Sequence, residues 1–263
     1  MIKKIFNNKD HKIYYGSCLD AVNEIQDKSC KLLFADPPYN MGKNFGNNKD
    51  KWKTIEEYKN WTINWIEKFY NKISDSGSIM IMGHPRYSSY LIPYLDKKFT
   101  YTNQIIFYYT DGMPEKKNFE KRYEMILYYR KNEEKYTFNV EPVRVPLVRY
   151  DKTSNPKGKN PNDVWQINRV RWNSKERIRN EKNKISHVSQ KPIKLLRRII
   201  LATTNKNDLV IDPFLGTGTT SVACKELGRK SIGIEMNKDY SMIAKKRLQH
   251  TKKLEKKLEP DLR

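Results

Sequence analysis

Strand-like runs alternate with helix-like runs along most of this chain, and this alternation is the feature that most restricts its fold. Short apolar runs typical of strands occur at 12–15, 31–35, 78–82, 104–109, 124–129, 208–211 and 230–234. Between several of them apolar residues recur at helical spacing, at 58–69, 193–202, 219–227 and 240–248. The pattern predicts an α/β fold, with a mainly parallel twisted sheet covered by helices on both faces. Ligands of such a sheet bind at the carboxyl ends of its strands.

The sequence Asp36-Pro37-Pro38-Tyr39 directly follows the apolar run at 31–35. Two consecutive prolines remove two backbone donors and fix two φ angles, so the strand must end there. Nearby carbonyl groups are therefore free to accept hydrogen bonds beside a carboxylate and an aromatic ring. This combination predicts a pocket that stacks a planar base and accepts hydrogen bonds from its amino group. The alternative is a surface turn that closes a strand.

A glycine-rich turn follows the strand-like run at 208–211. It contains Asp212, Phe214, Gly216 and Gly218, and a predicted helix begins near Thr219. The two glycines let the backbone approach a ligand closely, and the next strand ends at Glu235, where an acid binds ribose hydroxyls. A Gly-Lys-Ser/Thr phosphate loop and the third glycine of a dinucleotide fingerprint are both missing. The sequence therefore favours a nucleoside without phosphates, such as S-adenosylmethionine, over NAD or ATP, with a plain tight turn as the alternative.

The charge balance points to a polyanionic partner. The chain has 52 Lys and Arg against 30 Asp and Glu, a net charge of +22, and nucleic acid is the first candidate. Basic residues mixed with aromatic residues and amides fill the segment 131–187, where the strand-helix alternation stops. We expect this segment to be a DNA-contacting insertion between two parts of one domain, 1–130 and 188–263. The alternatives are a solvated surface loop and the lysine-rich composition of an AT-rich genome.

Several classes of protein are disfavoured. No window approaches 18 apolar residues and the N-terminus lacks a signal peptide's apolar core, so we expect a soluble cytoplasmic protein that does not contact membrane. Three scattered cysteines and four scattered histidines give neither a disulfide framework nor a zinc pattern, and no metal site is expected. The Gly- and Asn-rich loop 40–50 is either a lid over the substrate or an ordinary crossover.

With both motifs identified, the sequence resembles the β-class amino-group DNA methyltransferases, in which the acidic Pro-Pro-Tyr motif precedes the glycine-rich motif. A target-recognition segment lies between the two motifs in that class, and the order is the same here over nearly the whole chain. The resemblance implies a Rossmann-like S-adenosylmethionine-dependent methyltransferase fold with 131–187 as the target-recognition insertion. It also implies S-adenosylmethionine as cofactor and double-stranded DNA as partner, and leaves open a homodimer and a cognate restriction endonuclease on a separate chain.

The resemblance assigns the catalytic turn to Asp36, Pro37, Pro38 and Tyr39. In such enzymes the target base is flipped out of the duplex, because its amino group is inaccessible inside the stack. The Asp36 carboxylate and the Pro37 carbonyl accept the two amino hydrogens, Tyr39 stacks on the base, and the nitrogen lone pair then attacks the methyl group in line.

The cofactor contacts are also carried over by resemblance. Ser189-Gln-Lys-Pro192 is similar to the motif that holds the methionine end, with a plain helix start as the alternative. The turn 15–20 is similar to the adenine-contacting segment and leaves open whether Ser17, the Cys18 backbone or Asp20 makes that contact. The expected cofactor residues are Ser17, Cys18, Asp36, Lys191, Asp212, Phe214, Gly216, Gly218, Thr219 and Glu235.

The target base follows from the first residue of the catalytic motif. Carbon-5 cytosine methylation needs a Pro-Cys nucleophile, which this chain lacks. The cytosine-N4 enzymes tend to carry Ser at the first position, so Asp36 favours adenine N6, with cytosine N4 and a catalytically silent DNA-binding protein as alternatives. The expected DNA contacts are Lys43, Arg144, Arg149, Lys157, Lys159, Arg169, Arg171 and Arg177.

Overall fold

One nine-stranded sheet runs through the chain, in the order β1-β2-β9-β8-β3-β4-β6-β5-β7. The computed structural model describes residues 2–43, 50–112, 114–147, 149, 153, 155–179 and 189–254. The strands are β1 (Lys3–Asn7), β2 (His11–Tyr15), β3 (Cys30–Ala35), β4 (Ile73–Gly83), β5 (Thr100–Tyr108), β6 (Tyr123–Arg130), β7 (Val164–Gln166), β8 (Leu209–Asp212) and β9 (Lys230–Glu235). The α-helices are α1 (Cys18–Ala21), α2 (Ile55–Tyr70), α3 (Pro85–Ser88), α4 (Ile92–Lys98), α5 (Ile193–Thr203), α6 (Thr219–Glu226) and α7 (Lys238–His250), and short 3₁₀ turns lie at η1 (Val22–Glu24), η2 (Ser89–Leu91) and η3 (Glu141–Val143).

Most strand pairs are parallel, as the alternating pattern predicts. The strands β2, β9, β8, β3 and β4 run in one direction, and β5 and β7 run the same way. The strand β6 is antiparallel to both β4 and β5, and β1 is antiparallel to β2. The reversed strand β6 therefore begins at the edge where its neighbours end. The turn 36–39, to which the resemblance assigns catalysis, follows β3 at this edge. We therefore call it the catalytic edge and the opposite one the far edge.

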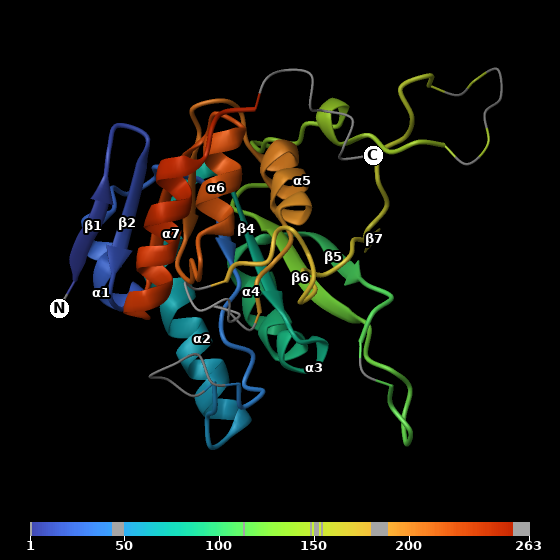
Figure 1. Cartoon of the computed structure of the whole chain (residues 1–263), viewed down its shortest axis with the longest axis horizontal. Helices are drawn as coiled ribbons and strands as arrows, with labels where there is room; N and C mark the ends of the chain where they lie inside the picture. The colour runs from blue at the N-terminus through green and yellow to red at the C-terminus, as the bar shows by residue number, and fades with distance from the viewer. Residues whose placement is uncertain are drawn as a thin grey trace.

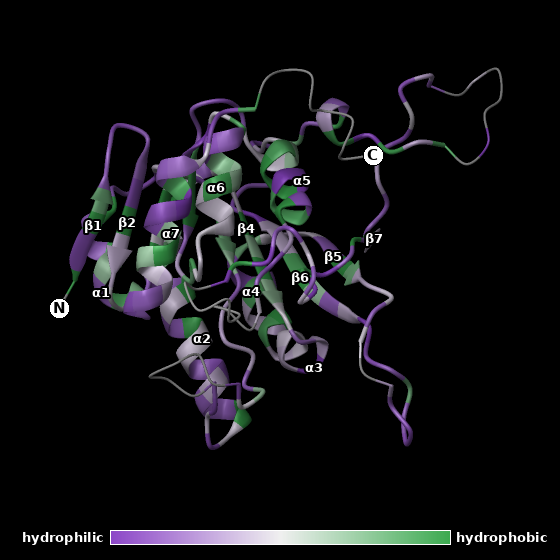
Figure 2. Cartoon of the chain, in the orientation of Figure 1, coloured by the Kyte–Doolittle hydropathy of each residue, from purple (hydrophilic) through white to green (hydrophobic). Residues whose placement is uncertain are grey.

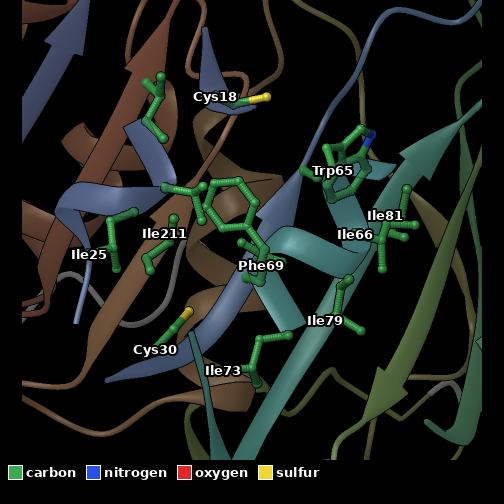
Figure 3. Packing of buried hydrophobic residues seen from close by; sticks show 14 of the residues in the cluster. Cys18, Ile25, Cys30, Trp65, Ile66, Phe69, Ile73, Ile79, Ile81 and Ile211 are labelled. Atoms are coloured by element: carbon green, nitrogen blue, oxygen red, sulfur yellow. The ribbon is translucent and has the colours of Figure 1, made fainter. Parts of the chain in front are cut away.

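Helices cover both faces of the sheet (Figure 1). On one face α2 packs Trp65, Ile66 and Phe69 against the buried residues of β3, β4 and β8 (Figure 3). On the other face α5 and α6 cover β3, β4, β5 and β6, and α7 covers β2. The central strands are hydrophobic, whereas the connections that project from the body are mainly hydrophilic (Figure 2). Burial of both sheet faces explains why the central strands are continuous apolar runs instead of alternating ones.

Two strands were not predicted. The edge strand β1 carries two lysines and is largely exposed, and β7 has three residues of which only Trp165 is buried. Neither has the apolar run that identifies a buried strand. The strand β7 lies within 131–187 and pairs with β5, so part of the predicted insertion extends the main sheet. The role of that segment in target recognition stays a prediction.

None of the helices in the described part of the chain is long and apolar enough to cross a membrane.

Candidate active site

The catalytic edge brings together four segments that are far apart in the sequence. Asp36 follows the end of β3, Asp212 and Glu235 end β8 and β9, and α5 begins just after Lys191. Because β6 runs in the opposite direction, its second residue, Glu124, lies at the same edge. The sheet topology therefore supplies acidic groups from four strands and a lysine from the approach to a helix.

The catalytic turn is held by a network of charged hydrogen bonds. The Tyr39 hydroxyl lies 2.5 Å from Asp36 Oδ1 and 2.8 Å from Glu124 Oε2. Lys191 Nζ lies 3.1 Å from Asp36 Oδ2 and 3.1 Å from Glu124 Oε2. The two carboxylates thus share one ammonium group and one hydroxyl, and each of the four side chains fixes the others.

The shared lysine also decides how the carboxylates titrate. Burial raises the Asp36 pKa, the Lys191 charge opposes this, and the nearby Glu124 charge adds to it, so the pKa stays above its ordinary value. Burial also acts to raise the Glu124 pKa, but Lys191 and the Tyr39 hydroxyl outweigh it and the pKa is lowered. Burial lowers the Lys191 pKa, but the two carboxylates outweigh it and the pKa is raised. Asp36 is therefore the more basic carboxylate of the pair.

The backbone carbonyls of Pro37 and Pro38 differ in their hydrogen bonds. The buried Tyr58 of α2 donates a hydrogen bond from its hydroxyl to the Pro38 carbonyl at 3.0 Å. Within the described residues no donor is placed on the Pro37 carbonyl. Asp36 and Pro37 both line the site cavity. The turn can therefore offer an amino group two acceptors, a carboxylate and a backbone carbonyl.

A cavity of about 450 Å³ extends from the catalytic turn to the glycine-rich turn. Its volume lies in the range of small-molecule sites. Of the predicted cofactor residues, the cavity is lined by Ser17, Cys18, Asp36, Lys191, Asp212, Phe214, Gly216, Thr219 and Glu235. Pro37, Pro38, Tyr39 and Lys43 line the same space. The two predicted motifs thus form one continuous site.

Buried carboxylates shape the glycine-rich turn. Asp212 accepts hydrogen bonds from the Phe214 N–H at 2.9 Å and from the Thr220 hydroxyl at 2.5 Å. Burial raises the Asp212 pKa to about 7, although these two hydrogen bonds oppose the rise. Glu235 accepts from the N–H of Gly216 and of Asn237, each at 2.7 Å. Burial also raises the Glu235 pKa. The carboxylate of Glu235 borders the cavity at the position expected of a ribose-binding acid.

Gly218 has a different role from the predicted one. It does not line the cavity, and it precedes α6 with φ +89°. A Cβ atom at this position would come within 2.9 Å of the Ala244 backbone on α7. Gly218 therefore permits the turn and the close packing of α7, while Gly216 lies at the ligand side.

The turn at 15–20 is placed against the glycine-rich turn. The Gly16 N–H donates to the Glu235 carbonyl at 2.9 Å, and Ser17 caps α1 by accepting from the Leu19 N–H. Ser17 and Cys18 line the cavity, whereas Asp20 is exposed and does not. Of the three alternatives for this contact, Asp20 is therefore the one that the geometry disfavours.

An aromatic wall beside Phe214 was missed from the sequence. The Phe214 ring lies 5.7 Å from Trp61 and 5.3 Å from Trp65, and Trp52 lies 4.7 Å from Trp61, all between ring centroids. Trp52 and Trp61 also line the cavity. Trp61 and Trp65 recur at helical spacing, which indicates burial but does not show that α2 faces the site, and Trp52 lies before α2.

Glu124 was also missed as a site residue, since it appeared only as the first residue of an apolar strand. A carboxylate at the start of such a strand was the available signal. The predicted lid 40–50 lies mostly outside the described residues, because 44–49 are not described. At its ends, the Asp50 carboxylate accepts hydrogen bonds from the N–H groups of Asn40 and Met41.

The predicted DNA contacts divide between the two edges. Arg169 and Arg171 follow β7 at the catalytic edge, where both pair with Asp111, and Lys43 Nζ lies 5.9 Å from the centre of the Tyr39 ring. Arg177 belongs to the same stretch and donates to the Val170 carbonyl. Arg144 follows η3, which packs on the last turn of α5 at the far edge. The remaining far residues, Lys157 and Lys159, are tied to that stretch through Glu141 and Val145.

The comparisons with known proteins agree with this geometry. The model of the DNA methylase family of N6/N4 methyltransferases matches residues 30–246. The type II methyltransferase M.HpaI of Haemophilus parainfluenzae is 34% identical over 91% of this chain and 74% of its own length. The DNA adenine methyltransferase YhdJ of Escherichia coli is 35% identical over 92% of this chain and 84% of its own length.

A solved structure supports the fold and the cofactor. The M1.HpyAVI complex with S-adenosylmethionine (SAM) superposes with a TM-score of 0.62 at 28% identity, over 90% of this chain and 100% of that one. The cavity here fits the same cofactor, since it offers a carboxylate for ribose hydroxyls at Glu235 and aromatic walls at Phe214 and Trp61. The site geometry and the family match lead to one conclusion: the chain belongs to the N6/N4 DNA methylase family and is an S-adenosylmethionine-dependent DNA methyltransferase.

Proposed function

We propose that the protein methylates the N6 amino group of a flipped adenine in double-stranded DNA. The observation that carries the proposal is the Asp36 carboxylate at the cavity, raised in pKa and placed beside the Pro37 carbonyl. YhdJ, which is similar over most of this chain, is a DNA adenine methyltransferase. Cytosine N4 is the alternative, because the family includes both kinds of amino-group enzyme.

Residues of the catalytic turn act on the N6 amino group of the target adenine. Its lone pair is conjugated into the ring, which makes the nitrogen a poor nucleophile. Two acceptors, Asp36 and the Pro37 carbonyl, favour a pyramidal nitrogen whose lone pair is available, and Tyr39 lies where it can stack on the ring. When bound, S-adenosylmethionine would supply the electrophilic methyl group, and the broken sulfonium C–S bond would leave S-adenosylhomocysteine. When the nitrogen has gained the methyl group it must lose a proton, and Asp36 is placed to accept it.

The cofactor is held by the cavity residues on the glycine side. We assign Glu235 to the ribose hydroxyls and Phe214 with Trp61 to the apolar surface of the cofactor. The Lys191 ammonium group contacts Asp36 and Glu124, so we assign it mainly to the catalytic turn. It also contacts the Ser189 hydroxyl, and we assign that contact to the methionine end of the cofactor.

The DNA contacts are proposed for the catalytic edge. Among the predicted residues, Lys43, Arg169, Arg171 and Arg177 lie there and are assigned to phosphates. We do not assign DNA contacts near the target base to three predicted residues that lie at the far edge, Arg144, Lys157 and Lys159. The contact of Arg149 with DNA stays a prediction. A cognate restriction endonuclease on a separate chain fits the type II names of the relatives. A homodimer stays a prediction. We also propose a location in the bacterial cytoplasm at the nucleoid, because the DNA substrate is there.

The test is methyl transfer from labelled S-adenosylmethionine to unmethylated DNA, followed by modification-sensitive sequencing. We expect N6-methyladenine at one short sequence. The variant Asp36→Ala should reduce the rate of methyl transfer by at least about 100-fold, because it removes a hydrogen-bond acceptor for the amino group and the carboxylate that takes its proton. Retained binding of labelled S-adenosylmethionine, measured by equilibrium dialysis, is the control. Methylated cytosine would establish the alternative, and full transfer by Asp36→Ala would overturn the mechanism.

A further inference from the structure

The connection between β5 and β6 leaves the sheet beside the catalytic turn. The strand β5 ends at Tyr108 and β6 begins at Tyr123, so both ends of this connection lie at the catalytic edge. We call residues 111–112 and 114–122 the β5–β6 arm. It reaches away from the body of the protein (Figure 1). Glu124, two residues beyond the arm, contacts the Tyr39 hydroxyl. The arm therefore projects from the edge that DNA must approach for its base to reach Asp36.

The root of the arm is fixed to the protein. The Tyr109 N–H donates to the Arg122 carbonyl at 2.9 Å. Arg169 donates to the Asp111 carbonyl at 3.0 Å and to its carboxylate at 3.2 Å, and its guanidinium lies 4.2 Å from the centre of the Tyr109 ring. These contacts tie the root of the arm to the basic stretch that follows β7.

The arm carries an aromatic side chain with no cover. Phe119 is 99% exposed, the highest value among the large hydrophobic residues that are described as exposed. A single exposed apolar residue is common on protein surfaces and is not a site by itself. Here it lies among exposed Lys116, Lys117 and Lys121, and none of these three lysines forms an ion pair within the described part of the chain. Exposed aromatic and free ammonium groups in one segment are the chemistry that binds bases and phosphates.

Base flipping creates a need for such a segment. When a nucleotide leaves the stack, its neighbours lose their stacking surface, at a cost of about a few kcal/mol. An apolar or aromatic side chain that packs against the exposed bases recovers part of this cost. Among the described residues of the catalytic edge, Tyr39 lines the cavity, and its ring is already assigned to the flipped base itself.

We propose that the β5–β6 arm is a DNA-contacting element that packs Phe119 against the bases beside the flipped nucleotide. Lys116, Lys117 and Lys121 face the adjacent phosphates. The proposal rests on the proposed function in requiring a flipped base, but it does not depend on whether that base is adenine or cytosine. It adds a contact outside the segment 131–187, to which the sequence assigned DNA recognition.

The experiment compares Phe119→Ala, Phe119→Trp and the control Phe138→Ala, which makes the same change at a half-exposed phenylalanine of the far edge. The probe is a duplex oligonucleotide that contains the methylated sequence, with 2-aminopurine in place of the target base when that base is adenine. We expect Phe119→Ala to bind this duplex about tenfold more weakly and to lose most of the fluorescence increase that reports flipping. Phe119→Trp should restore both, and Phe138→Ala should match the native protein.

Four further outcomes decide the proposal. A Lys116→Ala/Lys117→Ala double variant should weaken binding and reduce its salt dependence. Binding of labelled S-adenosylmethionine, measured by equilibrium dialysis, should be the same in all variants, which shows that each is folded. If Phe119→Ala binds, flips and methylates like Phe138→Ala while the native protein is active, the arm is not a DNA contact. If the native protein transfers no methyl group to DNA, the proposed function fails instead.

Discussion

At the catalytic turn, two carboxylates share the hydrogen-bond donors of one lysine and one tyrosine. Asp36 and Glu124 compete for Lys191 and for the Tyr39 hydroxyl, which has one hydrogen to donate and two carboxylates in contact. A second carboxylate near Asp36 acts against its ionisation and makes it a stronger base, whereas Lys191 acts in the opposite direction. The two partners should therefore have opposite effects on the pH at which Asp36 becomes active.

The prediction concerns the acid limb of the pH–rate profile. Asp36 must be ionised to accept the amino hydrogens, so activity falls as pH falls through its pKa. Glu124→Gln removes a charge that raises this pKa, and the acid limb should move to lower pH with a slower rate at the plateau. Lys191→Gln removes a charge that lowers it, and the acid limb should move to higher pH. Single-turnover methyl transfer at saturating cofactor and DNA measures both.

The control for these variants is Glu67→Gln, which neutralises an exposed glutamate paired with Lys98 on the surface. Its profile should match that of the native protein. A merely structural role for Glu124 and Lys191 would lower the rate without moving the two acid limbs in opposite directions.

The residues at the turn show what a sequence can and cannot predict. Asp36 to Tyr39 were predictable because the four residues are contiguous and their chemistry is local. Glu124 was not, because its contact with Tyr39 depends on the reversal of β6 and on its place beside β4. Lys191 was predicted as a site residue, but its two carboxylate partners follow only from how α5 approaches the sheet.

At the scale of elements, the glycine-rich turn is a junction between β8, α6 and α7. Gly218 adopts φ +89° and lies against Ala244, whereas Gly228 adopts φ +71° with no atom near the position of a Cβ. Alanine at Gly228 would have only the cost of a left-handed backbone conformation. Alanine at Gly218 would have the same cost and also a steric clash with Ala244.

The prediction is a difference in stability between two alanine variants. Gly228→Ala should lower the free energy of unfolding by about 1–2 kcal/mol, the cost of a left-handed conformation for a residue with a Cβ. Gly218→Ala should lose clearly more and should also weaken cofactor binding, because α7 must shift away from the turn. Urea unfolding measures both. Equal losses would contradict the clash with Ala244.

Elements with long apolar runs could be predicted, and elements at the sheet edges could not. The helices α2, α5, α6 and α7 and the seven predicted strands all occur, because burial on the sheet imposes a clear pattern on them. The strands β1 and β7 are short and partly exposed, and their pairing is decided by neighbouring strands instead of by their own composition.

At the scale of the whole molecule, basic residues occur at both edges but the reacting groups occur at one. The net charge of +22 therefore attracts DNA without selecting a surface. The proposed catalytic role of Asp36 implies that DNA binds at the catalytic edge. From the sequence we expected DNA contacts along the whole of 131–187. The order of residues alone does not show which part of this segment lies at which edge of the sheet.

The prediction compares one exposed cation from each edge. Arg171→Ala at the catalytic edge should weaken DNA binding for all sequences and should reduce the slope of log affinity against log salt by about 1. Lys157→Ala at the far edge, where the side chain is 73% exposed, should leave both unchanged. Titration of labelled duplex at several salt concentrations measures the slope. A similar loss for Lys157→Ala would place DNA on both edges.

The described residues of the far-edge connection between η3 and β7 extend away from the body of the protein (Figure 1), and none of them lines the site cavity. A chain opened there, near Asn155 to Gly158, would give one piece with Asp36, Tyr39 and Glu124 and another with Lys191 and the glycine-rich turn. Neither piece would hold a complete set of reacting groups, and β7 with α5 would have to dock on β5 and β3 to restore it. The topology thus makes this enzyme a candidate for a split methyltransferase, whose activity would report the association of two fused proteins on DNA.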